Sequence, residues 1–149
     1  RAFLFVMDAP QGPVSLFFQN SASAVDLSVP IMIEGRNYGA PIENLRSALR
    51  DAGLQRVDLW IGTGGAEIAS LLLPLLRPVA YMPVHWDGLW GAFKAGPPAP
   101  FSDARLERLL AESDVALIRP TQYMDKWRLD RSGVHALDNQ KVKLALGFR

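Results

Sequence analysis

The two histidines, His85 and His135, are the side chains of this sequence best suited to bind a metal or move a proton near neutral pH. His85 follows an apolar run at residues 79–84 and precedes a glycine-rich segment. In layered α/β folds, ligand and metal sites collect where strands end, because the strand fixes the side chain and the loop leaves it accessible. His85 is therefore a candidate metal ligand, with a structural or surface role as the alternative. His135 lies in an expected hairpin, and we interpret it as structural.

Two polar segments also follow apolar runs. Residues 20–23 (Asn-Ser-Ala-Ser) could hold a ligand or could cap backbone groups through Asx and Ser turns. Residues 62–65 (Gly-Thr-Gly-Gly) resemble a phosphate cradle but lack the Lys-Ser/Thr of a P-loop and the spacing of a dinucleotide fingerprint, so a tight strand-to-helix turn is favoured. Neither Ser21 nor Ser23 stands in a Gly-x-Ser-x-Gly elbow, and no Ser-His-Asp set can be assembled from the spacing.

Strands and helices are expected to position these residues. Apolar, aromatic-rich runs at residues 2–7 and 14–19, separated by a segment with proline and glycine, predict a hairpin with a long loop. Residues 20–41 read mainly as a surface connection. From Pro41 onward, apolar residues at helical spacing predict a helix that ends near Gly53.

The rest of the chain alternates between the two kinds of element. We expect strands at residues 57–62, 79–84 and 115–118, a helix at 66–76, and a helix capped by Ser102. Residues 126–137 could form a hairpin, and the last residues fit either a strand or a short helix. This order predicts an α/β (α+β layered) architecture, with a mixed sheet and helices on one face.

Composition excludes several classes of protein. The 149 residues correspond to a single domain, and 16 basic against 15 acidic side chains leave a net charge of +1, which gives no electrostatic reason to expect nucleic-acid or membrane-surface binding. The longest apolar stretch, residues 68–84, is interrupted by prolines and an arginine, so it is not a membrane span. No cysteine is present, which excludes disulfides and thiolate chemistry but leaves the compartment open.

Five pieces of the sequence, taken in order, resemble the C-terminal half of a metallo-β-lactamase-fold hydrolase. They are the strand end and turn at residues 17–23, the helix after it, the strand and glycine turn at 57–65, the Leu-Arg-Pro helix exit at 76–78, and the strand end at 83–87. The resemblance implies that residues 1–149 form a single domain that is half of an αββα sandwich. The missing N-terminal half, or a second chain, would be the partner.

The resemblance also implies a metal site. His85 would match the family's last metal-ligand histidine, and Asn20 stands where the family has a bridging aspartate. A neutral amide supplies no charge to balance two cations, so Asn20 favours a single metal or none. The metal, which the resemblance implies is zinc, would need the upstream His-x-His-x-Asp-His ligands, which this sequence does not contain. Because the chain opens at Arg1 in mid-strand, we expect it to be part of a longer polypeptide; a chain trimmed at a domain edge is the alternative.

Residues after His85 would complete the site. Asp87 would orient the histidine from behind, and Trp86, Trp90 and Phe93 would line the substrate pocket. The implied function is a metal-dependent hydrolase in which a metal-activated water attacks an ester, lactone, lactam or phosphoester of a small molecule. Two alternatives stay open: a non-catalytic binding domain or subunit with a degenerate metal site, and an unrelated α/β domain whose glycine-rich turn binds an anion.

Overall fold

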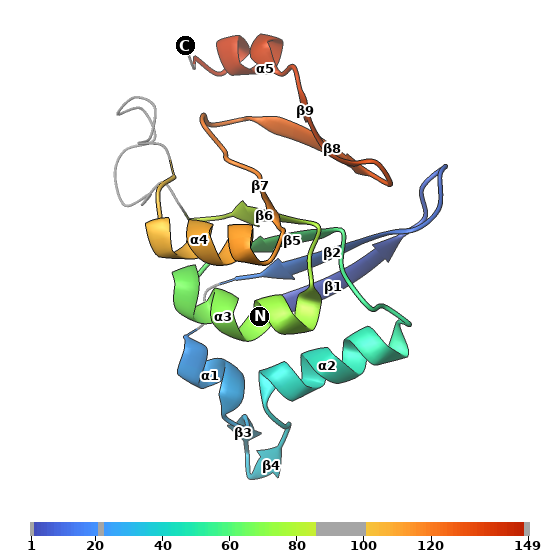
Figure 1. Ribbon diagram of the computed structural model, residues 1–149, viewed down its shortest axis with the longest axis vertical. Helices are drawn as coiled ribbons and strands as arrows, with labels where there is room; N and C mark the ends of the chain where they lie inside the picture. The colour runs from blue at the N-terminus through green and yellow to red at the C-terminus, as the bar shows by residue number, and fades with distance from the viewer. Residues whose placement is uncertain (1, 21–22, 86–100, 148–149) are drawn as a thin grey trace.

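A five-stranded mixed sheet forms the centre of the protein (Figure 1). The computed structural model describes residues 2–20, 23–85 and 101–147. In the sheet, the strand order is β1-β2-β5-β6-β7, with β1 antiparallel to β2 and the other neighbouring strands parallel. The strands are β1 (Ala2–Met7), β2 (Val14–Gln19), β5 (Leu59–Gly62), β6 (Ala80–Pro83) and β7 (Ala116–Leu117). The expected mixed sheet is confirmed.

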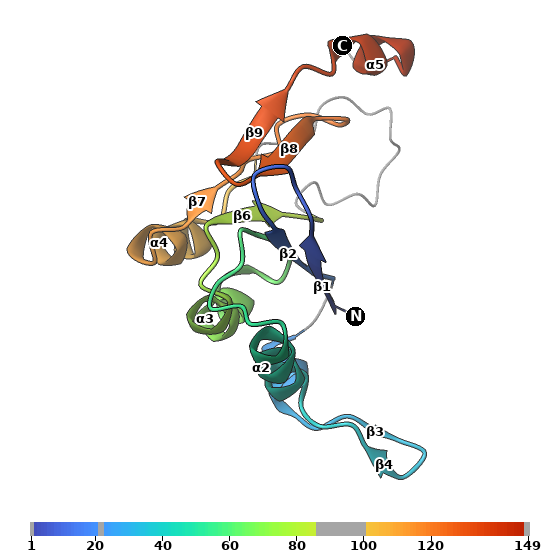
Figure 2. The same cartoon turned by 90° about the vertical axis from the view of Figure 1, so that its right-hand side faces the viewer.

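Helices α2, α3 and α4 lie on one side of this sheet, and the C-terminal hairpin lies on the other (Figure 2). The three helices are α2 (Pro41–Asp51), α3 (Gly65–Leu76) and α4 (Ala104–Glu112). The hairpin consists of β8 (Lys126–Asp130) and β9 (Gly133–Leu137), and α5 (Gln140–Ala145) follows it. The apolar periodicity of the sequence predicted the three helices and allowed the hairpin, whereas the region of α5 fitted either a strand or a short helix.

Local signals explain where the helices begin and end. Pro41 occupies the first turn of α2, where the missing N–H costs nothing, and Gly53 takes a positive φ of 65° just beyond the end of that helix. Ser102 was expected to cap the helix now assigned as α4, and this expectation is wrong. The cap is Asp103, whose side chain accepts a hydrogen bond from the backbone N–H of Leu106 at 3.0 Å.

The segment expected to be a surface connection contains structure of its own. It forms the short helix α1 (Ala24–Ser28) and a small hairpin of β3 (Met32–Ile33) and β4 (Arg36–Asn37). A capping box starts α1, because Ser23 and Asp26 each accept a hydrogen bond from the other's backbone N–H. Helix α1 packs against α2 and α3, so it extends the helical layer beneath the β1–β2 end of the sheet.

The core lies between the sheet and the helices. Phe17, Trp60 and Tyr81 occupy neighbouring positions on β2, β5 and β6, and all three are at most 3% exposed. They pack with buried residues of α3 and α4. On the opposite face of the sheet, the alternating register places apolar side chains throughout, and near the edge Phe3 and Phe5 are 50% and 46% exposed. Their ring centroids lie 6.2 Å apart.

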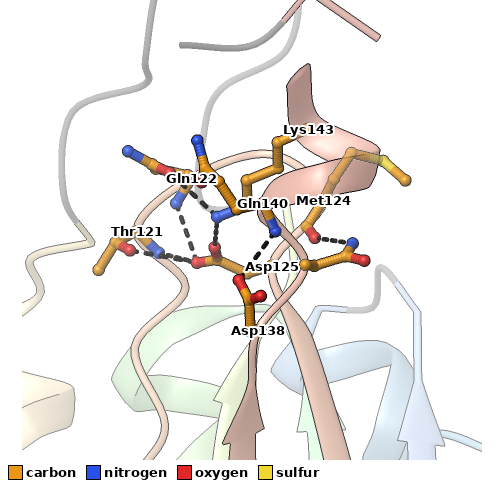
Figure 3. A network of polar contacts seen from close by, with 8 residues as sticks. Thr121, Gln122, Met124, Asp125, Asp138, Gln140 and Lys143 are labelled. Atoms are coloured by element: carbon orange, nitrogen blue, oxygen red, sulfur yellow. Dashed lines mark hydrogen bonds and ion pairs between the residues drawn. The ribbon is translucent and has the colours of Figure 1, made fainter. Parts of the chain in front are cut away.

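Polar contacts attach α5 to the loop before β8 (Figure 3). The carboxylate of Asp125 accepts hydrogen bonds from the backbone N–H groups of Thr121 and Gln122 at 2.9 and 3.0 Å, and from Lys143 of α5. Asn139, which precedes α5, donates to the carbonyl oxygen of Met124 at 2.6 Å. The C-terminal residues that fitted both a strand and a helix are therefore held as a helix. No helix among the described residues has the length and apolar character that a membrane span requires.

Candidate metal centre

The carboxyl ends of β2, β5 and β6 meet at one edge of the sheet, because these three strands are parallel neighbours. Asn20 follows β2, Thr63 follows β5, and His85 follows β6 by two residues. Continued beyond the last paired residues, the register of these strands would align Asn20 with Thr63 and with Val84, the residue before His85. Strands β2 and β6 are two interstrand spacings apart, roughly 10 Å. The two sequence-predicted metal ligands, Asn20 and His85, are therefore at the same edge, on either side of β5, and both are exposed.

The backbone changes direction at His85. The backbone N–H of Val84 donates to the carbonyl oxygen of Gly62 at 2.9 Å, so pairing with β5 continues to this residue. His85 then takes a positive φ of 57°, a conformation uncommon for residues other than glycine. Four other described residues that are not glycine share a positive φ, so this conformation marks a change of chain direction and not by itself a functional site. The strand thus holds the histidine rigidly on its N-terminal side and presents it to solvent.

Gln19 joins the ends of β2 and β5. Its side chain is almost completely buried, at 2% exposure. The amide nitrogen donates to the carbonyl oxygen of Asn20, and the amide oxygen accepts from the backbone N–H of Thr63 at 3.3 Å. These two backbone groups belong to Asn20 and Thr63, the residues that directly follow β2 and β5 at the candidate site. Gln19 therefore fixes the position of Asn20 without itself facing solvent.

A close approach of side chains explains the glycine at the end of β5. A Cβ atom built on Gly62 would lie 2.3 Å from Nε1 of Trp60 and 2.9 Å from Oε1 of Gln19. The Trp60 and Tyr81 rings meet edge to face with centroids 4.6 Å apart, and the Tyr81 hydroxyl donates to the carbonyl oxygen of Gly62 at 3.0 Å. Burial raises the pKa of Tyr81 well above its ordinary value, and the charge of Asp103 raises it further. Tyr81 therefore remains a neutral donor beneath the site.

The glycine-rich turn leads into α3 without a side-chain cap. Gly64 and Gly65 both take positive φ, 103° and 63°, which glycine adopts without strain. A Cβ on Gly65 would lie 3.1 Å from a carboxylate oxygen of Asp103, so an acidic group already stands beside the start of α3. A negative charge there opposes the binding of a second anion. This arrangement disfavours the phosphate-cradle interpretation and supports the tight-turn interpretation.

His135 lies far along the chain from this edge, on β9. Its Nε2 atom is 2.8 Å from the Ser132 hydroxyl and 3.2 Å from the Asp130 carboxylate. Both partners meet the same ring nitrogen, whereas a catalytic triad uses one nitrogen for the serine and the other for the acid. The hydrogen bonds of Ser132 lower the pKa of Asp130 well below its ordinary value, and His135 adds to this effect. These contacts close the turn of the hairpin and support a structural role for His135.

The described residues do not by themselves form a complete metal site. Among residues 2–20, 23–85 and 101–147, no group of three or more His, Cys, Asp or Glu side chains could hold a metal ion. Catalytic zinc ordinarily has three protein ligands, so His85 and Asn20 fit a zinc ion only together with donors from elsewhere. Four further predicted site residues, Trp86, Asp87, Trp90 and Phe93, lie outside the described residues.

None of the protein-family models, curated proteins or solved structures compared with this chain matches it. The arrangement of the site therefore rests on the sequence and the structure alone.

A groove of about 740 Å³ adjoins the site and has no counterpart in the sequence-based predictions. It lies between the β1–β2 end of the sheet and helices α1 and α2, and Gln19 and Asn20 form part of its wall. No local pattern could have revealed it, because it depends on how β1 pairs with β2 and on a helix that was not expected. The polar residues that follow β2 were the one sequence feature near the groove, and they indicated a ligand or a backbone cap instead of an apolar cavity.

Proposed function

We propose that this chain is the C-terminal part of a metal-dependent hydrolase of the metallo-β-lactamase superfamily, with His85 and Asn20 as two of its metal ligands. The observation that carries the proposal is that these residues follow the ends of β2 and β6 at the same edge of the sheet, with β5 between them. A partner, either an N-terminal half or a second chain, would supply the remaining ligands from a His-x-His-x-Asp-His segment.

The apolar sheet face supports a larger domain around the site. Phe3 and Phe5 expose about half of their surface on the face that the helices leave uncovered. A second layer packed on this face, as in an αββα sandwich, would remove that apolar surface from water. The same layer would bring its own strand ends to the edge where His85 and Asn20 lie.

The chain's own residues would have distinct roles in such a site. His85 would coordinate the metal through one nitrogen of its neutral imidazole, and Asp87 would orient the ring by accepting a hydrogen bond from the other ring nitrogen. Asn20 would bind through its amide oxygen and add no charge, which favours one metal ion over two. A bound zinc ion would lower the pKa of a water molecule to about 7 and polarise the scissile bond. Trp86, Trp90 and Phe93 would line the pocket for an ester, lactone, lactam or phosphoester.

A specific observation favours the second candidate function, a non-catalytic binding domain. Asn20 is neutral where a bridging carboxylate would be expected, and the described part of the chain holds no three-ligand group. A metal site that has lost its ligands would show both features, a neutral residue at the bridging position and too few ligand side chains. In that case the exposed apolar face would serve to bind a protein partner.

Zinc content of the protein, isolated without denaturation together with any polypeptide that accompanies it, tests the proposal. We expect zinc to be lost in His85→Gln and retained in the matched variant His135→Gln, whose ring is held by Ser132 and Asp130. Asn20→Asp should raise the zinc content, because a carboxylate can bridge two cations. Equal zinc in wild type and His85→Gln, or no zinc beside a histidine-rich partner, would favour the binding domain.

A further inference from the structure

The groove beside the candidate site is lined mainly by apolar residues. Leu4 and Phe17 line it from the sheet, Leu27 and Leu45 line it from α1 and α2, and Leu72 contributes from α3. Its volume of about 740 Å³ falls within the range of small-molecule sites. We propose that this groove binds the apolar acyl chain of the substrate, which makes the substrate a neutral ester or amide of an aliphatic acid; the inference rests on the proposed hydrolase function.

The groove has one polar end that connects it to the site. Gln19 and Asn20 line the groove at the end of β2, and Asn20 is also the residue at the candidate metal edge. A molecule with its chain along Leu4 and Leu45 would therefore bring its polar group toward Asn20. This continuity makes the groove a substrate subsite instead of a separate binding site.

Two further polar residues of the groove, Asp26 and Asn44, make hydrogen bonds within the protein, as Gln19 does. Asp26 accepts the backbone hydrogen bond of Ser23 in the capping box of α1. The Asn44 side chain donates to the carbonyl oxygen of Tyr38 at 2.8 Å. The interior thus offers packing to an apolar chain and few hydrogen bonds along its length.

Charge selects among the substrate classes. None of the groove-lining residues in the described part of the chain is a lysine, an arginine or a histidine, and one of them, Asp26, is acidic. A phosphoester would bring negative charge to a groove without a basic side chain. The groove therefore favours esters, lactones, lactams or amides over phosphoesters.

A series of alkyl methyl ketones provides the test, because a ketone keeps the carbonyl group and cannot be hydrolysed. We would titrate the protein, together with any polypeptide that accompanies it, with butyl, hexyl and octyl methyl ketone in a calorimeter. The affinity should rise about fourfold for each added methylene, the value expected for burial of a CH₂ group. Ala48→Phe, which adds a ring on the groove side of α2, should weaken octyl ketone binding at least tenfold.

The matched control is Ala111→Phe, an exposed alanine on α4 that does not line the groove, and it should bind the ketones as the wild type does. No binding by the wild type, an affinity that is independent of chain length, or unchanged binding by Ala48→Phe would overturn the inference. If a polypeptide segment already occupied the groove, the wild type would not bind the ketones.

Chelation separates this inference from the proposed function. Ketone binding should persist after zinc is removed, because Asn20 is the only proposed zinc ligand among the described residues that line the groove. Chain-length-dependent binding with no zinc uptake would overturn the hydrolase proposal and, with it, the substrate role of the groove. Zinc uptake without ketone binding would overturn the groove assignment and leave the hydrolase proposal standing.

Discussion

The side-chain oxygen of Gln19 accepts a hydrogen bond from the backbone N–H of Thr63 at 3.3 Å, across the boundary between β2 and β5. This contact joins the ends of two parallel strands at the point where their regular pairing stops. The nitrogen of the same amide reaches the carbonyl oxygen of Asn20. One buried side chain therefore satisfies two backbone groups that a shorter apolar residue would leave without partners.

Gly62→Ala should destabilise the protein because its new Cβ would lie 2.3 Å from Nε1 and 2.8 Å from Cε2 of Trp60. Overpacking of this kind costs about 1–3 kcal/mol, which chemical denaturation would measure as a loss in the free energy of unfolding. The position of Asn20 should be disturbed as well, because the new Cβ would lie 2.9 Å from Oε1 of Gln19, whose amide nitrogen donates to Asn20.

A double-mutant cycle with Trp60→Phe provides the control for this substitution. The indole nitrogen of Trp60 is buried and has no hydrogen-bond partner among the described residues, so its removal leaves no acceptor unsatisfied. Gly62→Ala should cost less in the Trp60→Phe background than in the wild type. Equal costs in both backgrounds would contradict the steric explanation.

Stability should fall at alkaline pH because of Tyr81. Burial and the charge of Asp103 raise the pKa of Tyr81 in the folded protein above the ordinary value of 10.0. Above that pH the unfolded chain releases the proton while the folded protein keeps it, so the folded state binds more protons and its stability falls as the pH rises. The stabilisation that comes from keeping Tyr81 protonated is fully present below pH 10. Denaturation from pH 8 to about 11 should show a steeper loss for wild type than for Tyr81→Phe.

Asp103→Asn isolates the smaller of these two causes. The asparagine keeps the helix cap on Leu106 and removes the negative charge near Tyr81. The alkaline loss of stability should become slightly smaller, with little change at neutral pH. A large loss at neutral pH would show that the charge of Asp103 has a further structural role.

The attachment of α5 should weaken in acid. Burial opposes ionisation of Asp125, but hydrogen bonds from Lys143, Thr121 and Gln122 outweigh it and hold the pKa below the ordinary value of 3.8. A lowered pKa stabilises the folded state above the ordinary value, and this stabilisation is lost as the pH falls through the folded-state pKa. The protection factors of the α5 amides, which correct for the slower intrinsic exchange in acid, should therefore fall below about pH 4.

Asp125→Asn should give fast exchange in α5 already at neutral pH, because Lys143 would lose its charged partner. The control is Asp51→Asn at the end of α2, where the nearest contact with Arg50 is 3.9 Å and both side chains are about three-quarters exposed. That variant should leave α5 unchanged. Slow exchange in Asp125→Asn would show that α5 is held mainly by other contacts.

Elements with strong local signals could be predicted from the sequence. Pro41 and Gly53 bracket α2, and the proline and glycine between residues 7 and 14 separate the strands of the first hairpin. The short helix α1 was missed because five residues carry little periodicity. Its capping pair, Ser23 and Asp26, was a usable signal that the sequence pattern contained.

The arrangement of the site could be predicted only in part. Strand ends are visible in sequence, so His85 and Asn20 could be selected, but strand order is not local information. The position of β5 between β2 and β6 decides how far apart the two residues lie. The roles of Gln19 and Tyr81 depend on partners 44 and 19 residues away, which no nearby pattern encodes.

The antiparallel pairing of β1 with β2 has a practical consequence for protein engineering. Ala2 pairs with Gln19, so any sequence fused ahead of Ala2 would emerge beside the strand end that carries Asn20. A polyhistidine tag there would place competing imidazoles next to the candidate metal edge and could imitate the ligands that the proposed partner would supply. A tag beyond α5, which lies well away from β1 in both views, would keep zinc measurements interpretable (Figures 1 and 2).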